Sequence, residues 1–146
     1  MNNWISGEVN LIGVGVRYER MLAKKLSVGV SAHFSIIPVM FFLYNDIVAD
    51  ATIRFYPLGK TFFVGAGLGF YSMDGSSSWL GWRTGYWSYL GMAITPELGL
   101  KIDIGKPGKL FVQPGVKLPL VVVFSGDETE FQIGMPLIYF GFGFAF

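Results

Sequence analysis

Bulky apolar residues alternate with small or polar ones along most of this chain. The clearest case is the C-terminal segment, where every second residue from Ile138 to Phe146 is bulky and apolar. Because successive side chains of a β-strand point to opposite faces, such a segment has one face of bulky apolar side chains and one face of mostly small side chains. The same two-residue period predicts seven strands, at residues 7–20, 25–37, 47–57, 61–73, 87–104, 110–124 and 134–146.

The two faces of each predicted strand differ in chemistry. In residues 61–73, for example, Phe62, Val64 and Leu68 alternate with glycines. A soluble ligand-binding barrel would bury the bulky face and expose mostly glycine, serine and a few charges, which is a poor solvated surface. A membrane barrel instead turns the bulky face to lipid and packs small and ionisable residues inside. The pattern therefore predicts an all-β fold: one antiparallel up-and-down transmembrane β-barrel formed by residues 1–146, with about eight strands.

Composition supports a membrane protein without spanning helices. Of the 146 residues, 52% are hydrophobic and only 14% are charged, whereas about a quarter are charged in soluble domains. No apolar run reaches the roughly 18 residues of a spanning helix, and a closed barrel is the other structure that satisfies its backbone in lipid. A net charge of +1 gives no reason to expect nucleic acid, and the absence of cysteine excludes disulfides. No metal cluster or nucleotide motif is visible, so no cofactor is expected.

The predicted connections alternate between short and long. Short ones near residues 20–25, 57–61 and 105–109 hold Lys24, Lys25, Lys60, Lys106 and Lys109. Longer ones near 38–46, 73–87 and 125–133 hold Asp46, Asp74, Asp127, Glu128 and Glu130. Bacterial barrels have short periplasmic turns and longer external loops, which places the long loops outside. No signal peptide is visible at Met1, so export would have required a segment that has been removed.

An aromatic cluster lies in the second long loop. It is either part of the aromatic belt at the membrane interface or an exposed interaction surface. Its members are Trp79, Trp82, Tyr86 and Trp87.

Seven strands cannot close a fully antiparallel barrel. A first strand could be missing upstream of this chain, one long segment could be two strands, or another chain could donate the eighth. We favour a lost or a donated strand, which would pair antiparallel with the segment containing Val14 and Val16. A donated strand would make another membrane protein a partner.

Seven ionisable residues fall on the predicted inner face. Charges in a narrow lumen are costly unless they are paired, and eight strands leave an interior just filled by side chains. A salt-bridged plug is therefore favoured over a gated path for small solutes. The set comprises Arg17, Glu19, Asp50, Arg54, Glu97, Lys101 and Lys117.

The single histidine, His33, shares the inner face with Ser31 and Ser35, and Asp50 could lie on the neighbouring strand. A Ser–His–acid hydrolase is conceivable, and His-x-Ser at 33–35 resembles a lipid A deacylase. There the pair must reach lipid, whereas here the alternation points it into the lumen. A structural histidine is favoured, and no enzyme activity is expected.

Several motifs resemble those of small outer-membrane β-barrel proteins of the OmpA, OmpX and OmpW kind, and more closely a family of predicted barrels of unknown function. The resemblance covers nearly the whole chain and implies a bacterial outer-membrane protein. Such relatives carry one more strand before the Tyr18-Glu19-Arg20 segment. The other matching stretches are Leu26-Ser27-Val28-Gly29, Arg54-Phe55-Tyr56-Pro57, residues 62–69, Pro96-Glu97-Leu98-Gly99 and the terminal Phe146.

These observations leave two classes of function. The first is a structural or interaction component that works through extracellular loops or an unpaired strand edge. The alternative is a small-solute channel or a lipid A-modifying enzyme. Expected partners are outer-membrane lipid and the barrel-assembly machinery, which would read an insertion signal in the C-terminal strand. That signal comprises Phe140, Phe142, Phe144 and Phe146.

Overall fold

The computed structural model describes residues 3–10, 13–39, 42–59, 61–79, 82–105, 109–125, 128–134 and 136–146. Within these ranges the regular structure is entirely β, and no helix there could cross a membrane. The strands are β1 (Asn3–Asn10), β2 (Gly13–Ala23), β3 (Leu26–Val39), β4 (Phe42–Phe55), β5 (Phe62–Trp79), β6 (Trp82–Leu100), β7 (Ile102–Ile104), β8 (Leu110–Lys117), β9 (Leu120–Ser125), β10 (Glu128–Ile133) and β11 (Leu137–Ala145).

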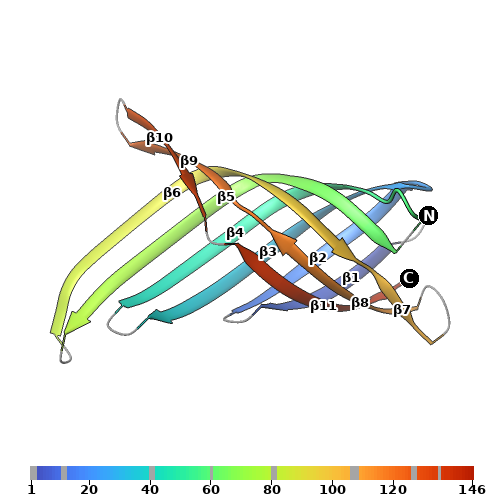
Figure 1. Ribbon diagram of the computed structural model, residues 1–146, viewed down its shortest axis with the longest axis horizontal. Helices are drawn as coiled ribbons and strands as arrows, with labels where there is room; N and C mark the ends of the chain where they lie inside the picture. The colour runs from blue at the N-terminus through green and yellow to red at the C-terminus, as the bar shows by residue number, and fades with distance from the viewer. Residues whose placement is uncertain are drawn as a thin grey trace.

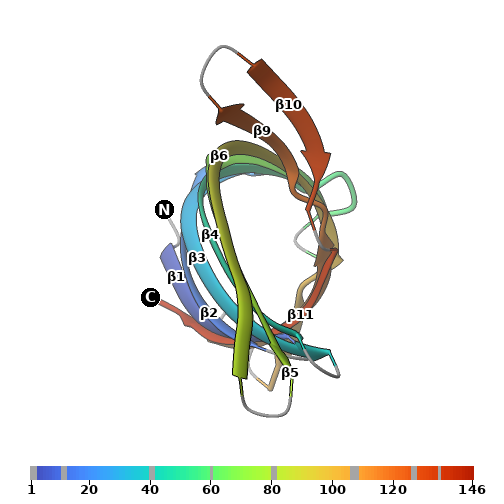
Figure 2. The same ribbon diagram turned by 90° about the vertical axis from the view of Figure 1, so that its left-hand side faces the viewer.

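These strands close into an antiparallel barrel with eight wall strands (Figures 1 and 2). Neighbours in sequence pair from β1 to β6, β11 lies between β1 and β8, and the β6–β8 pairing completes the circle. Three wall strands are made of two consecutive pieces each, namely β6 with β7, β8 with β9, and β10 with β11. The predicted fold class is confirmed.

The eighth strand is β1, and it belongs to this chain. It pairs with β2 through Gly7 opposite Val16 and with β11 through Gly7 opposite Phe142. The predicted position of the missing strand is right, but the prediction that it is absent or donated is wrong. The segment predicted at 7–20 merges two strands. Its first strand was missed because two positions of β1 break the alternation, with bulky Trp4 inside and bare Gly7 outside.

Proline interrupts the wall where the sequence predicts one strand at 110–124. Pro119 has no N–H to donate to the ladder, so β8 ends before it and β9 begins after it. Both pieces pair with β6, and the backbone N–H of Leu118 donates to the carbonyl of Pro96 across the break, at 3.0 Å. The interruption bends the wall without opening it.

The predicted long loops at 38–46 and 73–87 are largely strand. β3 and β4 stay paired as far as Val39 opposite Phe42, and β5 and β6 as far as Trp79 opposite Trp82. Both hairpins protrude well beyond the rest of the wall (Figure 1). β10 occupies most of the third predicted loop, at 125–133, and the β9–β10 hairpin leans away from the barrel (Figure 2).

The four residues of the aromatic cluster therefore belong to strands β5 and β6 and not to a loop, which corrects that expectation. The side chains of these four residues lie outside the described part of the structure. The residues are Trp79, Trp82, Tyr86 and Trp87.

Bulky residues face outward as the alternation predicts. Phe140, Phe142 and Phe144 on β11 have 49%, 55% and 51% of their surface exposed, and Phe146 follows them. The intervening Gly141 and Gly143 face the lumen. Such an apolar outer surface suits contact with lipid rather than with water.

A disulfide can test the place of β1. Ile5 lies directly opposite Phe144, and both side chains face outward. Since the chain has no cysteine of its own, Ile5→Cys with Phe144→Cys should form one bond within a single chain after mild oxidation. The measurement is mobility on a non-reducing gel. Ile5→Cys with Val116→Cys, which β11 separates, is the matched control. Disulfide bonds between two chains instead would show that another chain donates the eighth strand.

Candidate functional site

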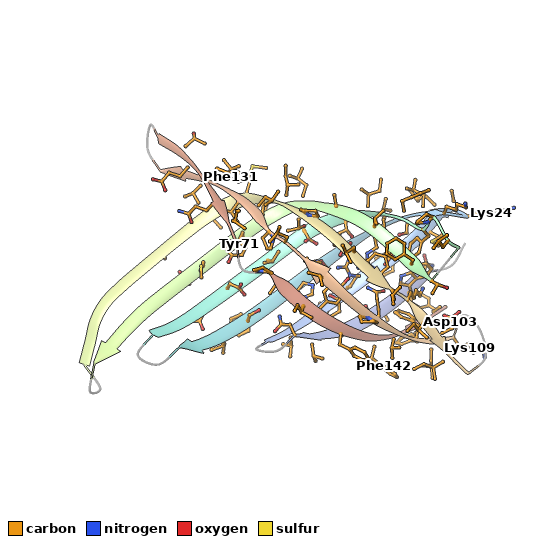
Figure 3. The ribbon with its side chains drawn as sticks, in the orientation of Figure 1. Lys24, Tyr71, Asp103, Lys109, Phe131 and Phe142 are labelled. Carbon is orange, nitrogen blue, oxygen red and sulfur yellow. The ribbon has the colours of Figure 1, made fainter. Side chains whose placement is uncertain are left out.

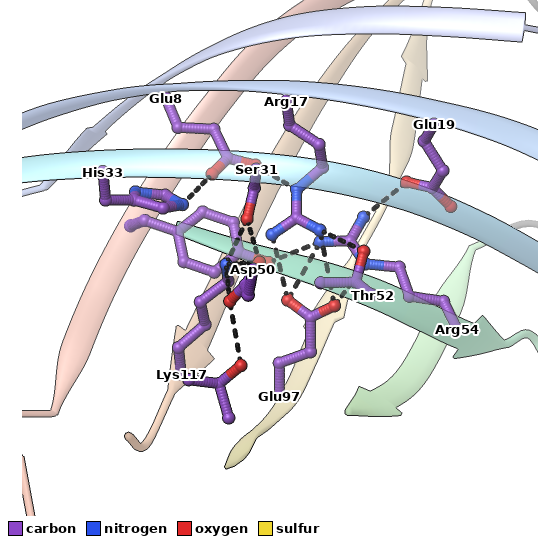
Figure 4. A network of polar contacts seen from close by, with 12 residues as sticks. Glu8, Arg17, Glu19, Ser31, His33, Asp50, Thr52, Arg54, Glu97 and Lys117 are labelled. Atoms are coloured by element: carbon purple, nitrogen blue, oxygen red, sulfur yellow. Dashed lines mark hydrogen bonds and ion pairs between the residues drawn. The ribbon is translucent and has the colours of Figure 1, made fainter. Parts of the chain in front are cut away.

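A layer of buried charges lies in the lumen between two apolar clusters, and Figure 4 shows its network of contacts. Strand β4 locates this layer along the barrel axis. The lumen-facing side chains of β4 in the layer are Arg54, Thr52 and Asp50. Tyr56 follows at the end with the short turns, and Val48 precedes at the end with the long hairpins. All five side chains are buried. The charge layer thus has an uncharged residue on either side along this strand.

Glu97 on β6 is the centre of the network. Its Oε1 lies 2.7 Å from Nε of Arg54, and its Oε2 lies 3.1 Å from Nη2 of both Arg54 and Arg17. One carboxylate therefore accepts hydrogen bonds from two guanidinium groups. Charge-assisted bonds of this geometry are the strong kind, and they join strands β2, β4 and β6 across the lumen.

Arg54 also connects to Glu19 on β2. Its Nη1 donates to Glu19 Oε2 at 2.7 Å, and its Nη2 donates to the Tyr139 hydroxyl at 3.0 Å. Glu19 in turn accepts from the hydroxyls of Tyr56, at 2.6 Å, and Ser27. The Arg54 guanidinium carbon lies 4.0 Å above the ring of Phe63, a cation–π contact.

A second group lies beside the first, around Asp50. Lys117 on β8 places its Nζ 3.2 Å from Asp50 Oδ2 and donates to the Ser31 hydroxyl at 2.7 Å. Ser31 and Thr95 donate to the same carboxylate, Thr95 at 2.8 Å. Asp50 therefore has one cation and two hydroxyl donors, which offsets much of the cost of burying its charge.

Glu8 is a member of the network that sequence reasoning missed. Its Oε1 lies 2.8 Å from Nε of Arg17, and its Oε2 lies 2.7 Å from Nε2 of His33. It was missed because β1 was not recognised. The signal available was its position two residues after Ser6 and four after Trp4, which places all three on the inner face.

His33 does not meet the expected acid. Its partner is Glu8, whereas Asp50 bonds Ser31, Thr95 and Lys117, and the Ser35 hydroxyl accepts from the Asn10 amide. The contacts described for these residues do not assemble the conceivable Ser–His–acid arrangement.

Lys101 faces the lumen at the end with the short turns. Its Nζ lies 3.1 Å from the centre of the Trp4 ring and 4.3 Å from that of Phe111. Aromatic rings attract a cation through their negative faces. Lys101 therefore lies among the aromatic side chains below the charge layer.

Two apolar layers enclose the charges. At the short-turn end Trp4, Met21, Tyr56, Phe63, Phe111 and Tyr139 pack together, and towards the hairpins Val48, Tyr71, Ala93, Val121, Val123 and Leu137 do so. Apolar side chains thus lie in the lumen on both sides of the charge layer, and Figure 3 shows Tyr71 of the second layer among the described side chains. Low dielectric on both sides strengthens each ion pair and makes an unpaired charge costly.

Inward glycines make room for this filling. A Cβ added at Gly67 would meet Thr95 Oγ1 and the Asp50 carboxylate, and one added at Gly99 would meet the ring of Phe63. The bare face of each strand is thus where large side chains from neighbouring strands lie.

The carboxylates of this network are engaged by guanidinium, ammonium, imidazole or hydroxyl groups. Among the described residues, no cluster of three or more histidine or acidic side chains could hold a metal ion.

Comparison with known proteins identifies the architecture. No family model and no curated protein matches the sequence. The crystal structure of Ail, the attachment invasion locus protein of Yersinia pestis, has a TM-score of 0.61 at 11% identity and covers 99% of this chain and 94% of its own. The N-terminal β-barrel domain of Pseudomonas aeruginosa OprF has a TM-score of 0.56 at 14% identity, with 99% and 96% covered.

The chain has the fold of the small outer-membrane β-barrels. At these identities the likeness extends to fold alone. The resemblance inferred from the motifs of the sequence agrees with it.

Substitution of Glu97 tests the network. Glu97→Ala leaves two buried guanidinium groups without their shared acceptor, and should lower the free energy of unfolding by about 3–5 kcal/mol. Glu97→Gln keeps the volume but loses the charge and should cost less. Glu130→Ala, at an exposed position, is the control. Urea unfolding of the lipid-reconstituted barrel is the measurement, and a loss no larger than that of the control would contradict a cohesive network.

Proposed function

We propose that this chain resides in the bacterial outer membrane as a barrel with a plugged lumen, and that it acts as a structural or interaction component. It contacts a partner through its protruding hairpins and their strand edges. The observation that carries the proposal is the difference between two parts of the molecule along the barrel axis. The barrel is filled by paired charges and apolar layers, while β3 to β6 extend beyond it.

The edges of the protruding sheet favour an interaction role. The pairing of β2 with β3 ends at Gly13 opposite Ser35, so residues 36–39 of β3 extend past it. On the other side β9 meets β6 only between Gly91 and Ile94, so residues 82–90 extend past it. Among the described strands, these two stretches have a neighbour on one side only. Exposed edges of this kind accept an added strand from a partner.

The C-terminal strand is proposed as the insertion signal for the barrel-assembly machinery. Its support is the outward row of Phe140, Phe142 and Phe144, ending at Phe146. Outer-membrane lipid is the proposed surrounding of the whole apolar band.

A small-solute channel is less well supported. Conduction requires a polar path, whereas the described lumen carries salt bridges between side chains with no solvent exposure. A lipid A-modifying enzyme is disfavoured as well, because His33 faces the lumen beside Glu8 rather than the lipid.

Electrical recordings can separate the plug from a pore. The wild-type barrel in a planar bilayer should show no stable conductance steps, because opening a path would expose buried, paired charges. Phe63→Ala with Phe111→Ala should also stay closed, since the charge layer remains. Steps on the nanosiemens scale from the wild type would identify a porin and refute the plugged lumen.

Site-specific crosslinking can test the interaction role. A photoreactive residue at Ile36 or Leu90, both exposed and next to the strand edges, should give an adduct of discrete mass in cells that make this protein. The same residue at Leu22, near a short turn, is the control. Replacing residues 76–86 with an Asn-Gly turn should abolish the Leu90 adduct. Absence of discrete adducts at both edge positions would refute the role.

A further inference from the structure

The outer surface of the barrel carries a shallow groove on β1, β2 and β3. It holds about 240 Å³ and is lined by Ile5, Val16, Tyr18, Val30 and Ala32, with the backbone region of Arg17 and Ser31 beneath. Since Arg17 and Ser31 direct their side chains into the lumen, the groove presents apolar side chains to the lipid.

The hollow follows from the strand register. Across these strands, Gly7, Val16 and Ala32 form one outward row, and two of the three are small. The next row towards the hairpins is Val9, Val14 and Phe34, which is bulky and closes that end.

Cationic side chains lie at the other end of the groove. The row beyond Ile5, Tyr18 and Val30 consists of Asn3, Arg20 and Val28, and Arg20 is exposed on the outer face. Lys24 and Lys25 follow in the turn and are exposed as well. At about 3.3 Å per residue, Arg20 lies about 13 Å along the strand from Val16.

Further polar groups lie at this end of the groove. The Tyr18 hydroxyl donates to Asn3 Oδ1 at 3.3 Å, and both groups are exposed. Lys25 donates to the Pro57 carbonyl at 3.2 Å, which ties the turn to its neighbour. Arg20, in the row next to the groove, and Lys24, in the turn that follows, place two exposed cations at this end.

We propose that this groove and its cationic end bind one anionic phospholipid of the leaflet at the short-turn end. An acyl chain fits between Val16, Val30 and Ala32, and the phosphate lies beside Arg20 and Lys24. A guanidinium matches the geometry of phosphate oxygens, and basic residues at a membrane surface attract anionic headgroups. The inference rests on the proposed membrane location of the barrel.

Native mass spectrometry can test this site. The barrel is released from micelles containing equal amounts of phosphatidylglycerol and phosphatidylcholine with the same acyl chains. The wild type should retain phosphatidylglycerol in preference to phosphatidylcholine by about fivefold for each cation that contacts the headgroup. Arg20→Gln with Lys24→Gln should abolish the preference. Ala32→Phe should fill the groove and lower the retention of both lipids.

Matched controls separate this site from general effects. Ala66→Phe adds the same bulk at an exposed alanine on β5, and Lys109→Gln removes an exposed cation elsewhere at the same end; both should behave as the wild type. Equal effects of each variant and its control would overturn the site. Displacement of phosphatidylglycerol by lipid A would overturn the assignment to a phospholipid. A wild-type barrel that fails to insert into vesicles of either lipid would instead refute the proposed membrane function.

Discussion

The backbone of a chain in lipid must satisfy its hydrogen bonds internally, and the rest of this structure depends on that constraint. An unpaired N–H or C=O in hydrocarbon costs several kcal/mol. β2 and β11 would each present an open edge if β1 were absent, and β1 pairs with both along its length. The backbone of β1 is therefore needed whatever its side chains are, which explains how a strand that breaks the alternation at Trp4 and Gly7 is retained. The same constraint holds β8 and β9 against β6 on both sides of Pro119.

Closing so few strands creates an interior too narrow for water to dominate. Its charges are then stabilised by one another and by buried hydroxyl groups, and Glu97 satisfies two arginines at once because they reach it from β2 and β4. The aromatic and aliphatic layers on either side keep the local dielectric low, so these pairs hold distant strands together. The network thus takes the place that an apolar core has in a soluble domain.

The sequence predicted those features that depend on the period of two. The outward row from Phe140 to Phe144 and the inward positions of Arg54 and Glu97 follow from alternation alone. β1 could not be predicted in the same way, because Trp4 faces inward and Gly7 outward. The composition of residues 74–78, which are glycine, serine and aspartate, predicts a loop where a long hairpin forms, because composition says nothing of pairing between strands. The partners of each charge depend on register between strands far apart in sequence, which no local pattern contains.

The end of the closed wall also marks where partners can bind. In the closed wall, β1 to β6, β8 and β11 each pair on both sides, as lipid requires, whereas β10 pairs with β9 alone. Beyond Ser35 on β3 and before Gly91 on β6, the described strands have a neighbour on one side only. Unpaired backbone is tolerated only where water can satisfy it, so these two residues bound the stretch that must lie outside the hydrocarbon. Because charges and apolar layers occupy the lumen, two surfaces are left for function. The protruding sheet presents backbone groups at its edges. The outer face of the wall presents an apolar groove with a cationic end.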